Sequence, residues 1–302
     1  MHWLLDLRHR TEYLLLRLLV GLIRLMPLDT SANLSAKLWR LLAPFGKKRH
    51  QRALANLALA YPEKSPEERL EIALAMWENL GRVMAETMQF DRLLADPSRI
   101  DIVSKPMLDR YGAKFGPAVG VSLHTGNWEL SIYPFVYYGG NPAAVYRLVK
   151  NPYVDRFLRK QRKGLYPGGL LAKGRDELGS NAAGQKTARQ MLDYVRRGGR
   201  LGIVCDLFDR QGVPVPFFGH PAPSTPIPAM IARRLGSRVW MSRCIRVGTS
   251  SRFQIEVKEL RVPRTANQGE DMKEMLRELH AQFELWVREY PEQWMWSNRR
   301  WA

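Results

Sequence analysis

The first thirty residues are dominated by leucine and interrupted by arginine at regular intervals. Residues 13–28 read YLLLRLLVGLIRLMPL, and Arg10, Arg17 and Arg24 recur every seven residues. This spacing places the arginines on one stripe of an α-helix and leaves the rest to leucine. A membrane span needs about 20 mainly apolar residues, and two charges break this run. The pattern predicts a helix in the membrane interface whose arginines reach lipid phosphates. A buried helix and a tilted span are the alternatives.

Helical spacing of apolar residues continues to about residue 95. It predicts short helices near residues 34–42 and 54–59. Ser65, Pro66 and Glu68 have the order of a capping box with proline at the first helical position. We therefore expect a long helix from Pro66 to about Phe90, and a helical lead-in over residues 31–95.

From residue 100 the pattern changes to short apolar or β-branched runs that alternate with helical stretches. The predicted strands are Ile100–Val103, Ala118–Leu123, Ala143–Tyr146, Leu201–Cys205 and Val239–Val247. Covering helices are expected to start near residues 127, 152, 185 and 225, and a last one contains the apolar stripe of residues 272–286. Such alternation is typical of an α/β fold with a mixed central sheet covered by helices. No repeat or linker divides residues 31–302, so we expect one α/β domain after a membrane-associated helix at residues 1–30.

The net charge of the chain limits the classes of partner that we expect for this domain. Lys and Arg number 47 against 29 Asp and Glu, a net charge of +18, which favours nucleic acid, an anionic bilayer or phosphorylated substrates. The leucine-rich start favours the bilayer over nucleic acid. The two cysteines, Cys205 and Cys244, lie in apolar runs, which fits a reducing compartment. Cysteine and histidine show no metal-ligand spacing, and we expect no metal and no cofactor.

The segment HTGNWE holds the strongest candidate chemistry. His124 directly follows a predicted strand, Thr125 and Gly126 form a turn, and Asn127 enters a helix that carries Glu129. We expect Glu129 to hydrogen-bond the imidazole, so that the other ring nitrogen takes a proton from a substrate hydroxyl. Amides of the turn are candidates for holding an oxyanion. Spacing alone also fits a histidine that caps a turn and a glutamate at a helix N-terminus.

HTGNWE resembles the HX4(D/E) box of the lysophospholipid acyltransferase superfamily, and its NWE ending resembles the late acyltransferases of lipid A biosynthesis. Two further segments are similar to that branch: GVPVPFFGHPAPSTPIPAMIARRLG at residues 212–236 and PEQWMWSNRRW at residues 291–301. The early EYLLLRLL and the pair Asn151 and Pro152 are similar as well. Three ordered blocks over nearly the whole chain make this resemblance specific.

The resemblance implies that His124, with Glu129 as partner, deprotonates a hydroxyl of a lipid A precursor. That hydroxyl attacks the thioester of an acyl carrier protein or of coenzyme A. The resemblance also implies the cytoplasmic face of a bacterial inner membrane. The alternatives are another glycolipid or a lysophospholipid as acceptor, hydrolysis with water as acceptor and, as a different class, a basic nucleic-acid-binding protein.

Four further residues are assigned to substrate binding on weaker signals. Asn127 lies inside the motif. Arg147 ends a predicted strand and Arg162 lies in a basic run, and both suit phosphates or an acidic carrier protein. Asp206 follows the strand at residues 201–205, where a carboxylate directed into the site is expected, and we expect it to orient one of these arginines.

The second block and the C-terminus add two expectations. Thr225 and Pro226 have the order of an N-cap and a first helical residue, so that helix is expected to receive a phosphate or line an acyl slot beside the PFFG turn. The C-terminal tryptophans fit either an interfacial aromatic belt or buried packing: Trp286, Trp294, Trp296 and Trp301.

Overall fold

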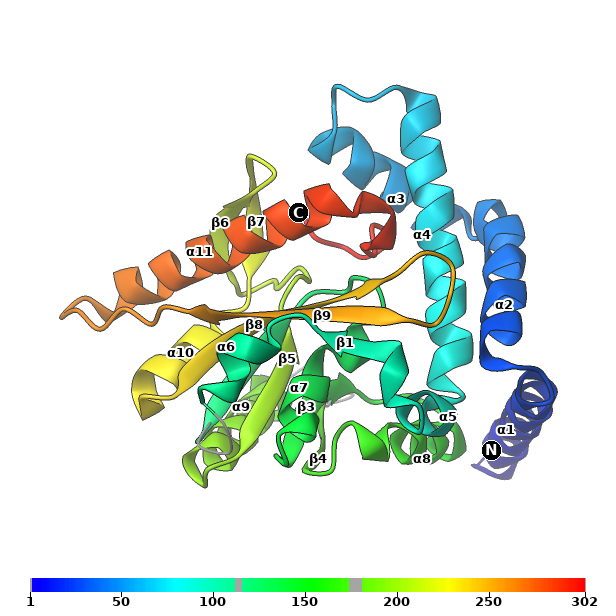
Figure 1. The fold of residues 1–302 in the computed structure, drawn as a ribbon, viewed down its shortest axis with the longest axis horizontal. Coiled ribbons are helices and arrows are strands. Elements are labelled where there is room, and N and C mark those ends of the chain that lie inside the picture. Colours follow the sequence, from blue (N-terminus) through cyan, green and yellow to red (C-terminus); the bar gives the residue numbers. More distant parts are fainter. Residues whose placement is uncertain (1, 112–115, 174–180, 302) are drawn as a thin grey trace.

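A helical lead-in stands at one end of the molecule (Figure 1). The computed structural model describes residues 2–111, 116–173 and 181–301. The lead-in consists of α1 (His2–Arg24), α2 (Leu28–Leu42), η1 (Ala43–Phe45), α3 (Lys47–Ala60), α4 (Pro66–Thr87) and α5 (Phe90–Leu94). Ser65 and Glu68 form the expected capping box at the start of α4: each side chain accepts from the backbone N–H of the other residue. The long helix is confirmed and ends three residues before Phe90.

A seven-stranded sheet of order β1-β9-β8-β2-β5-β3-β4 forms the centre. Its strands are β1 (Ile100–Ile102), β2 (Ala118–Ser122), β3 (Pro142–Arg147), β4 (Gly169–Lys173), β5 (Arg200–Val204), β8 (Arg238–Arg246) and β9 (Phe253–Leu260). Within the described residues of this seven-stranded sheet, only the pairing of β8 with β9 is antiparallel. The fold is therefore the expected α/β class with a mixed central sheet.

Side-chain alternation divides the buried residues between the two faces of this sheet. Val119, Val121 and Leu123 join one apolar cluster, whereas Ala118 and Trp240 join the other. The first cluster includes residues of α9 (Asn181–Arg196), α10 (Ile227–Leu235), α11 (Gln268–Glu289) and the lead-in. The second lies under η4 (Trp128–Ile132), α7 (Tyr133–Tyr137) and α6 (Lys105–Asp109). The remaining elements are η2 (Pro97–Arg99), α8 (Pro152–Gln161), η5 (Arg162–Gly164) and η6 (Pro291–Gln293).

A two-stranded hairpin, β6 (Val213–Phe217) and β7 (His220–Ser224), projects from the sheet beside α11 (Figure 1). It was not predicted, because VPVPF carries prolines that cannot donate to a strand ladder. The PFFG residues form its tip, where Phe218 and Gly219 have positive φ angles of 51° and 74°. The tip packs into an aromatic cluster with Trp294, Trp296 and Trp301. All four C-terminal tryptophans are buried, so the packing alternative holds.

Helix α1 exposes most of its leucines, and some of its arginines also contact other helices. Arg24 forms two hydrogen bonds of 2.7 Å with Asp91, and Arg17 lies over the ring of Phe157. Arg10 lies over the ring of Tyr153. Arg24 thus ties α1 to α5 and Arg17 packs on α8, whereas Arg10 is exposed and pairs with Asp6 of its own helix. That this stripe reaches lipid phosphates stays a prediction. Within the described ranges, we find no helix whose length and apolar content suffice for a bilayer crossing.

Candidate active site

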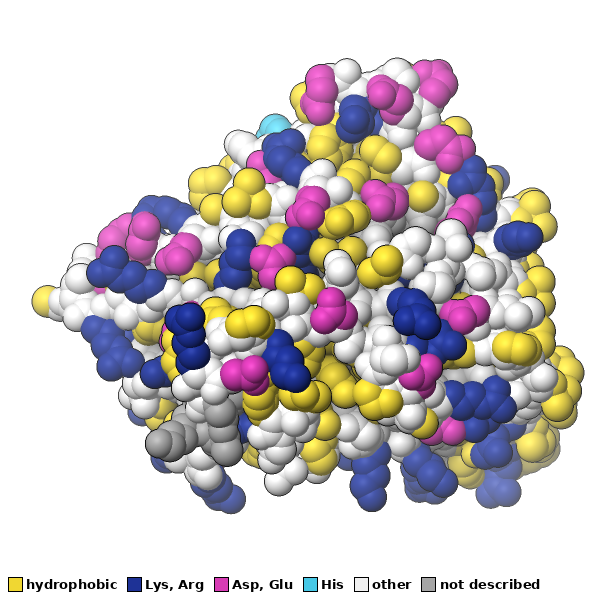
Figure 2. Space-filling model, in the orientation of Figure 1, with side chains coloured by type: hydrophobic (Ala, Val, Ile, Leu, Met, Phe, Trp, Pro, Cys, Tyr) yellow, Lys and Arg dark blue, Asp and Glu magenta, His cyan; other side chains and the backbone are white. Residues whose placement is uncertain are grey.

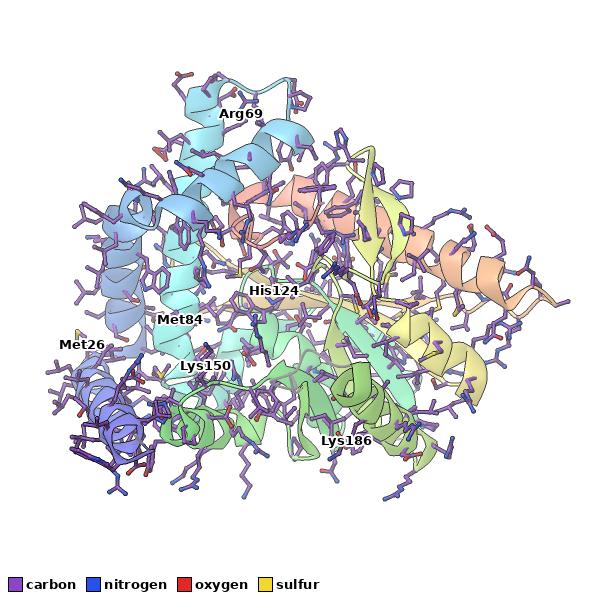
Figure 3. The ribbon with its side chains drawn as sticks, turned by 180° about the vertical axis from the view of Figure 1, so that it is seen from behind. Met26, Arg69, Met84, His124, Lys150 and Lys186 are labelled. Atoms are coloured by element: carbon purple, nitrogen blue, oxygen red, sulfur yellow. The ribbon has the colours of Figure 1, made fainter. Side chains whose placement is uncertain are left out.

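His124 and Asp206 meet at the carboxyl ends of two parallel neighbouring strands. Strands β2 and β5 pair with Ser122 opposite Val204, and the next two residues on each strand bring His124 opposite Asp206. The ring Nδ1 of His124 lies 2.7 Å from Asp206 Oδ1, and the backbone N–H of His124 donates to Oδ2 at 2.8 Å. Figure 3 shows His124 near the middle of the molecule.

Asp206 is held as an anion despite its burial. Burial raises the pKa of this carboxyl, but the charge and hydrogen bonds of His124 and a 2.7 Å bond from Trp294 Nε1 bring the pKa below its usual value. Nδ1 of His124 is therefore the donor in the contact. Burial lowers the pKa of His124, yet Asp206 outweighs this, and the pKa is raised. In the neutral ring the remaining nitrogen, Nε2, is free to accept a proton.

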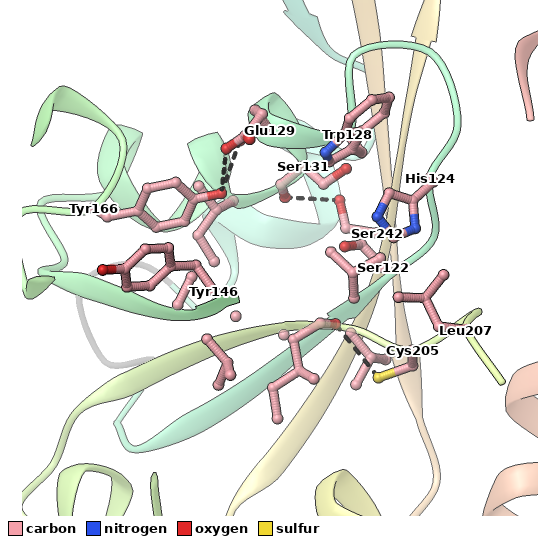
Figure 4. Close-up of a pocket in the computed structure, with 18 of the residues that line it drawn as sticks. Ser122, His124, Trp128, Glu129, Ser131, Tyr146, Tyr166, Cys205, Leu207 and Ser242 are labelled. Carbon is pink, nitrogen blue, oxygen red and sulfur yellow. Dashed lines mark hydrogen bonds between the residues drawn. The ribbon is translucent and has the colours of Figure 1, made fainter. Parts of the chain in front are cut away.

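Glu129 has a different partner from the one expected. Its Oε1 accepts from Arg162 Nε at 2.9 Å and Nη2 at 2.5 Å, and Tyr166 donates to Oε2 at 3.3 Å. No hydrogen bond to His124 is found among the described residues; Asp206 makes that contact instead. The reason is local: after Gly126, with φ at +54°, the chain enters the short helix η4, which carries Glu129 toward Tyr166 and away from His124 (Figure 4).

The amides of the turn are already engaged by the protein. Thr125 N–H donates to the carbonyl of Leu123 at 2.9 Å, and Gly126 N–H donates to the carbonyl of Gln293 at 3.1 Å. The expectation that these two amides hold an oxyanion is therefore wrong. The turn is closely packed, since a Cβ on Gly126 would lie 2.0 Å from the carbonyl oxygen of Cys244.

A pocket of about 750 Å³ opens beside His124. Its wall includes Glu129 and Arg162, and hydroxyls from Ser122 and Ser242 (Figure 4). Most of the remaining lining is apolar and includes Leu108, Ile132, Phe135, Leu170, Trp240 and Val257. A mostly apolar cavity of this size with a few polar groups is typical of a site for a small molecule or an acyl chain.

The other expected site residues divide between the pocket and the interior. Arg147 ends β3, is exposed and lines the pocket. Thr225 also lines it, but it is not a helix N-cap: α10 begins at Ile227, the cap position is Pro226, and no side chain caps it. The PFFG turn lies at the opposite end of the hairpin from Thr225.

Two further expectations are corrected by burial and hydrogen bonding. Asn127 is fully buried, and its Nδ2 donates to Glu86 Oε2 at 2.9 Å, so it does not face a substrate. Asp206 is only 2% exposed and orients His124 rather than an arginine. In both cases the sequence singled out the residue but not its hydrogen-bond partner, which lies on a distant segment of the chain.

Trp294 and Tyr166 were not identified as parts of the site. Trp294 donates to Asp206 across 88 residues of sequence, and Tyr166 lies 37 residues from Glu129. A tryptophan in the C-terminal block was the one available signal for the first. Neither contact follows from a local pattern.

The fold and the site together define an α/β enzyme with a histidine–aspartate pair beside a mostly apolar pocket. The model of the bacterial lipid A biosynthesis acyltransferase family matches residues 3–302, and the chain belongs to this family. It is therefore an acyltransferase of the lipid A biosynthesis type. A comparison with curated proteins gave no match.

Proposed function

We propose that this enzyme moves a fatty acyl group from a thioester of acyl carrier protein or coenzyme A to a hydroxyl of a lipid A precursor. His124 is the general base. The observation that carries the proposal is the His124–Asp206 pair beside the apolar pocket. The pair supplies a base of fixed orientation, and the pocket supplies apolar surface for an acyl chain.

The proposed reaction is a direct transfer. Nε2 of His124 takes the proton of the acceptor hydroxyl as its oxygen attacks the thioester carbonyl carbon. The tetrahedral intermediate collapses, the C–S bond breaks, and the imidazolium returns the proton to the departing thiolate. Asp206 stabilises the imidazolium formed between these steps and keeps the ring in one orientation.

Glu129 and Arg162 are proposed to act on charge rather than on the proton. Burial lowers the pKa of His124, and Asp206 raises it. The charge of Glu129 raises this pKa further, so Glu129 favours the imidazolium. Arg162 lines the pocket and brings a positive charge for the oxyanion that develops on the carbonyl. The carboxylate of Glu129 holds that guanidinium through two N–H groups.

The state of the thiols supports transfer without an acyl-enzyme. Cys205 lines the pocket, but burial raises the pKa of its thiol far above the usual value. Burial likewise raises the pKa of Cys244 to about 12. A thiol must ionise to become a strong nucleophile, so both remain inert at neutral pH.

The exposed leucines of the first two helices offer a surface for a membrane. The exposed large apolar side chains gather on the first two helices: Leu14, Leu15, Leu18, Leu19 and Leu22 on α1, and Leu34, Leu38, Leu41 and Leu42 on α2. Figure 2 shows apolar side chains along this edge with Lys and Arg below them. We propose that this leucine face, these nine residues, binds the cytoplasmic leaflet of the inner membrane peripherally. Arg147, exposed at the pocket, is proposed to bind a phosphate of the acceptor.

The test is a product analysis on purified, detergent-solubilised protein. Labelled acyl-carrier-protein and coenzyme A thioesters are offered with a tetraacylated lipid A precursor, a lysophospholipid or no acceptor, and lipids are resolved by chromatography. We expect a new acylated lipid with the lipid A precursor, absent with His124→Ala. A His124-dependent product on the lysophospholipid alone would replace the proposed acceptor, and hydrolysis alone with every acceptor would overturn transfer as the function.

A further inference from the structure

Behind the His124 turn lies a buried polar network that the reaction itself does not use. Its core is the ion pair of Glu86 in α4 and Arg246 at the end of β8, joined by hydrogen bonds of 2.5 Å and 2.9 Å. The two side chains are 0% and 3% exposed. Removing two such charges from water costs several kcal/mol per ion, and packing could be achieved there with apolar residues. We therefore expect this ion pair to have a role other than packing.

Asn79 connects this ion pair to the backbone of the turn. It lies two helical turns before Glu86 on the same side of α4. Its Oδ1 accepts from Arg246 Nε at 3.1 Å, and its Nδ2 donates to the carbonyl of Gly126 at 3.0 Å and to that of Gln293 at 3.3 Å. One side chain thus joins the ion pair, the turn and the C-terminal segment.

The C-terminal segment closes the network from the other side. The carbonyl of Gln293 accepts from Gly126 N–H at 3.1 Å, and Met295 N–H donates to the carbonyl of His124 at 3.0 Å. The side chain of Gln293 in turn bonds both backbone groups of Arg246, at 2.8 Å and 3.0 Å. The backbone on both sides of Thr125 is therefore fixed by groups that touch neither the pocket nor the ring of His124.

We propose that Asn79, held by the Glu86–Arg246 pair, is a positioning residue for His124, because it fixes the turn on which the base stands. This inference rests on the proposed function of His124. Misplacement of a catalytic group by about 1 Å costs on the order of 100-fold in rate. Loss of the Asn79 clamp is therefore expected to lower kcat more than it affects substrate binding.

The chain contains a matched control for this residue. Asn56 in α3 makes the same kind of clamp: its Nδ2 donates to the carbonyls of Trp296 and Asn298, at 2.8 Å and 3.0 Å. It holds the same C-terminal segment beyond Trp294 and makes no hydrogen bond to the turn. Asn79→Asp and Asn56→Asp both replace an amide donor by an acceptor without changing the shape of the side chain.

The experiment measures kcat, KM and the unfolding midpoint for both variants, with His124→Ala alongside. We expect Asn79→Asp to lower kcat by about 10- to 100-fold with KM within about twofold of wild type. Asn56→Asp is expected to keep kcat near wild type, and the unfolding midpoints show how far each substitution destabilises the protein. If Asn79→Asp does not fold, Asn79→Ser and Asn56→Ser take the place of the pair.

Two outcomes would overturn the inference: equal losses of kcat in the two asparagine variants, or a normal kcat in the Asn79 variant. Either result leaves the proposed function intact as long as His124→Ala is inactive. Activity in His124→Ala would instead remove the proposed function, whatever the asparagine variants do.

Discussion

The pH dependence of acyl transfer is expected to depend on both His124 and Asp206, because Asp206 raises the pKa of the His124 imidazole. His124 must be neutral to accept a proton, and its pKa is raised above 6.5 with Asp206 as the leading cause of the rise. The rate is therefore expected to increase as the pH passes upward through this raised pKa.

In Asp206→Asn, the loss of the negative charge lowers the pKa of the imidazolium, so the acid limb of the rate profile moves to lower pH. The rate on the plateau falls by about 100-fold or more, since the ring loses its orientation and the imidazolium its counter-charge. The measurement is kcat against pH for both proteins. An acid limb that stays in place would show that Asp206 does not act through His124.

At the residue scale, the sequence predicted which residues line the pocket better than it predicted which residues contact one another. His124, Glu129, Arg147, Arg162 and Thr225 all line the pocket. The hydrogen bond to His124 was assigned to Glu129 because five residues separate them, whereas Asp206 makes it across 82 residues. That pairing depends on β2 and β5 being neighbours, which no local pattern reveals.

At the scale of elements, two glycines on paired strands shape the pocket. Gly120 in β2 lies opposite Gly202 in β5, and both line the cavity. A Cβ on Gly202 would lie 2.7 Å from Cδ1 of Ile132, the mobile end of a side chain that also lines the pocket. A methyl group there would force Ile132 to shift, and we expect this change to reduce the space proposed for the acyl chain.

We therefore expect Gly202→Ala to prefer shorter acyl donors than the wild type. One methylene in an apolar pocket is worth about 1–3 kcal/mol, or roughly 10- to 200-fold in kcat/KM. The measurement is kcat/KM over a series of donors that differ in chain length. Gly269→Ala is the control, because its Cβ would make an ordinary 3.6 Å contact and Gly269 does not line the pocket. An identical chain-length profile in wild type and Gly202→Ala would mean that the chain lies elsewhere.

The leucine face yields a second prediction for elements. Leu18 and Leu22 of α1 are 67% and 60% exposed. Burying a leucine side chain stabilises by about 1.5–3 kcal/mol, so replacing both by glutamate is expected to weaken binding to anionic phospholipid vesicles about 100-fold or more. Co-sedimentation at several salt concentrations measures the effect. Leu285→Glu on α11, with 63% exposure, is the control, and equal loss in control and double variant would contradict the membrane role.

Elements with a continuous local signal were predicted well. The capping box fixed the start of α4, and uninterrupted apolar runs gave five of the sheet strands. Strands β6 and β7 were missed because of their prolines. Strands β4 and β9 were missed as well, although FQIEVKEL in β9 alternates apolar with polar residues, which is the pattern of a half-buried strand. Most leucines of α1 are exposed, as expected of a helix at a membrane surface, whereas the contacts of Arg17 with α8 and of Arg24 with α5 join segments distant in sequence.

At the scale of the whole molecule, the site is assembled from segments spread over most of the chain. Helix α4, the end of β5 and the C-terminal segment all bond His124 or the turn that follows β2, and the end of β8 bonds Asn79 of α4. The C-terminal block is distant in sequence from the histidine motif, yet Trp294 bonds Asp206 and Met295 bonds His124. The two sequence blocks that resemble one family, the histidine motif and the C-terminal block, therefore contact each other at the same site.

The central claim is that the imidazole of His124 removes the proton of the acceptor hydroxyl. The most direct measurement is the rate of acyl transfer by His124→Gln and wild type from pH 5 to 9, on folded protein with saturating donor. We predict that the variant loses on the order of 100- to 10,000-fold and that the acid limb seen in the wild type disappears. A variant that keeps most of the rate, or that keeps the same acid limb, would contradict the assignment of His124 as the base.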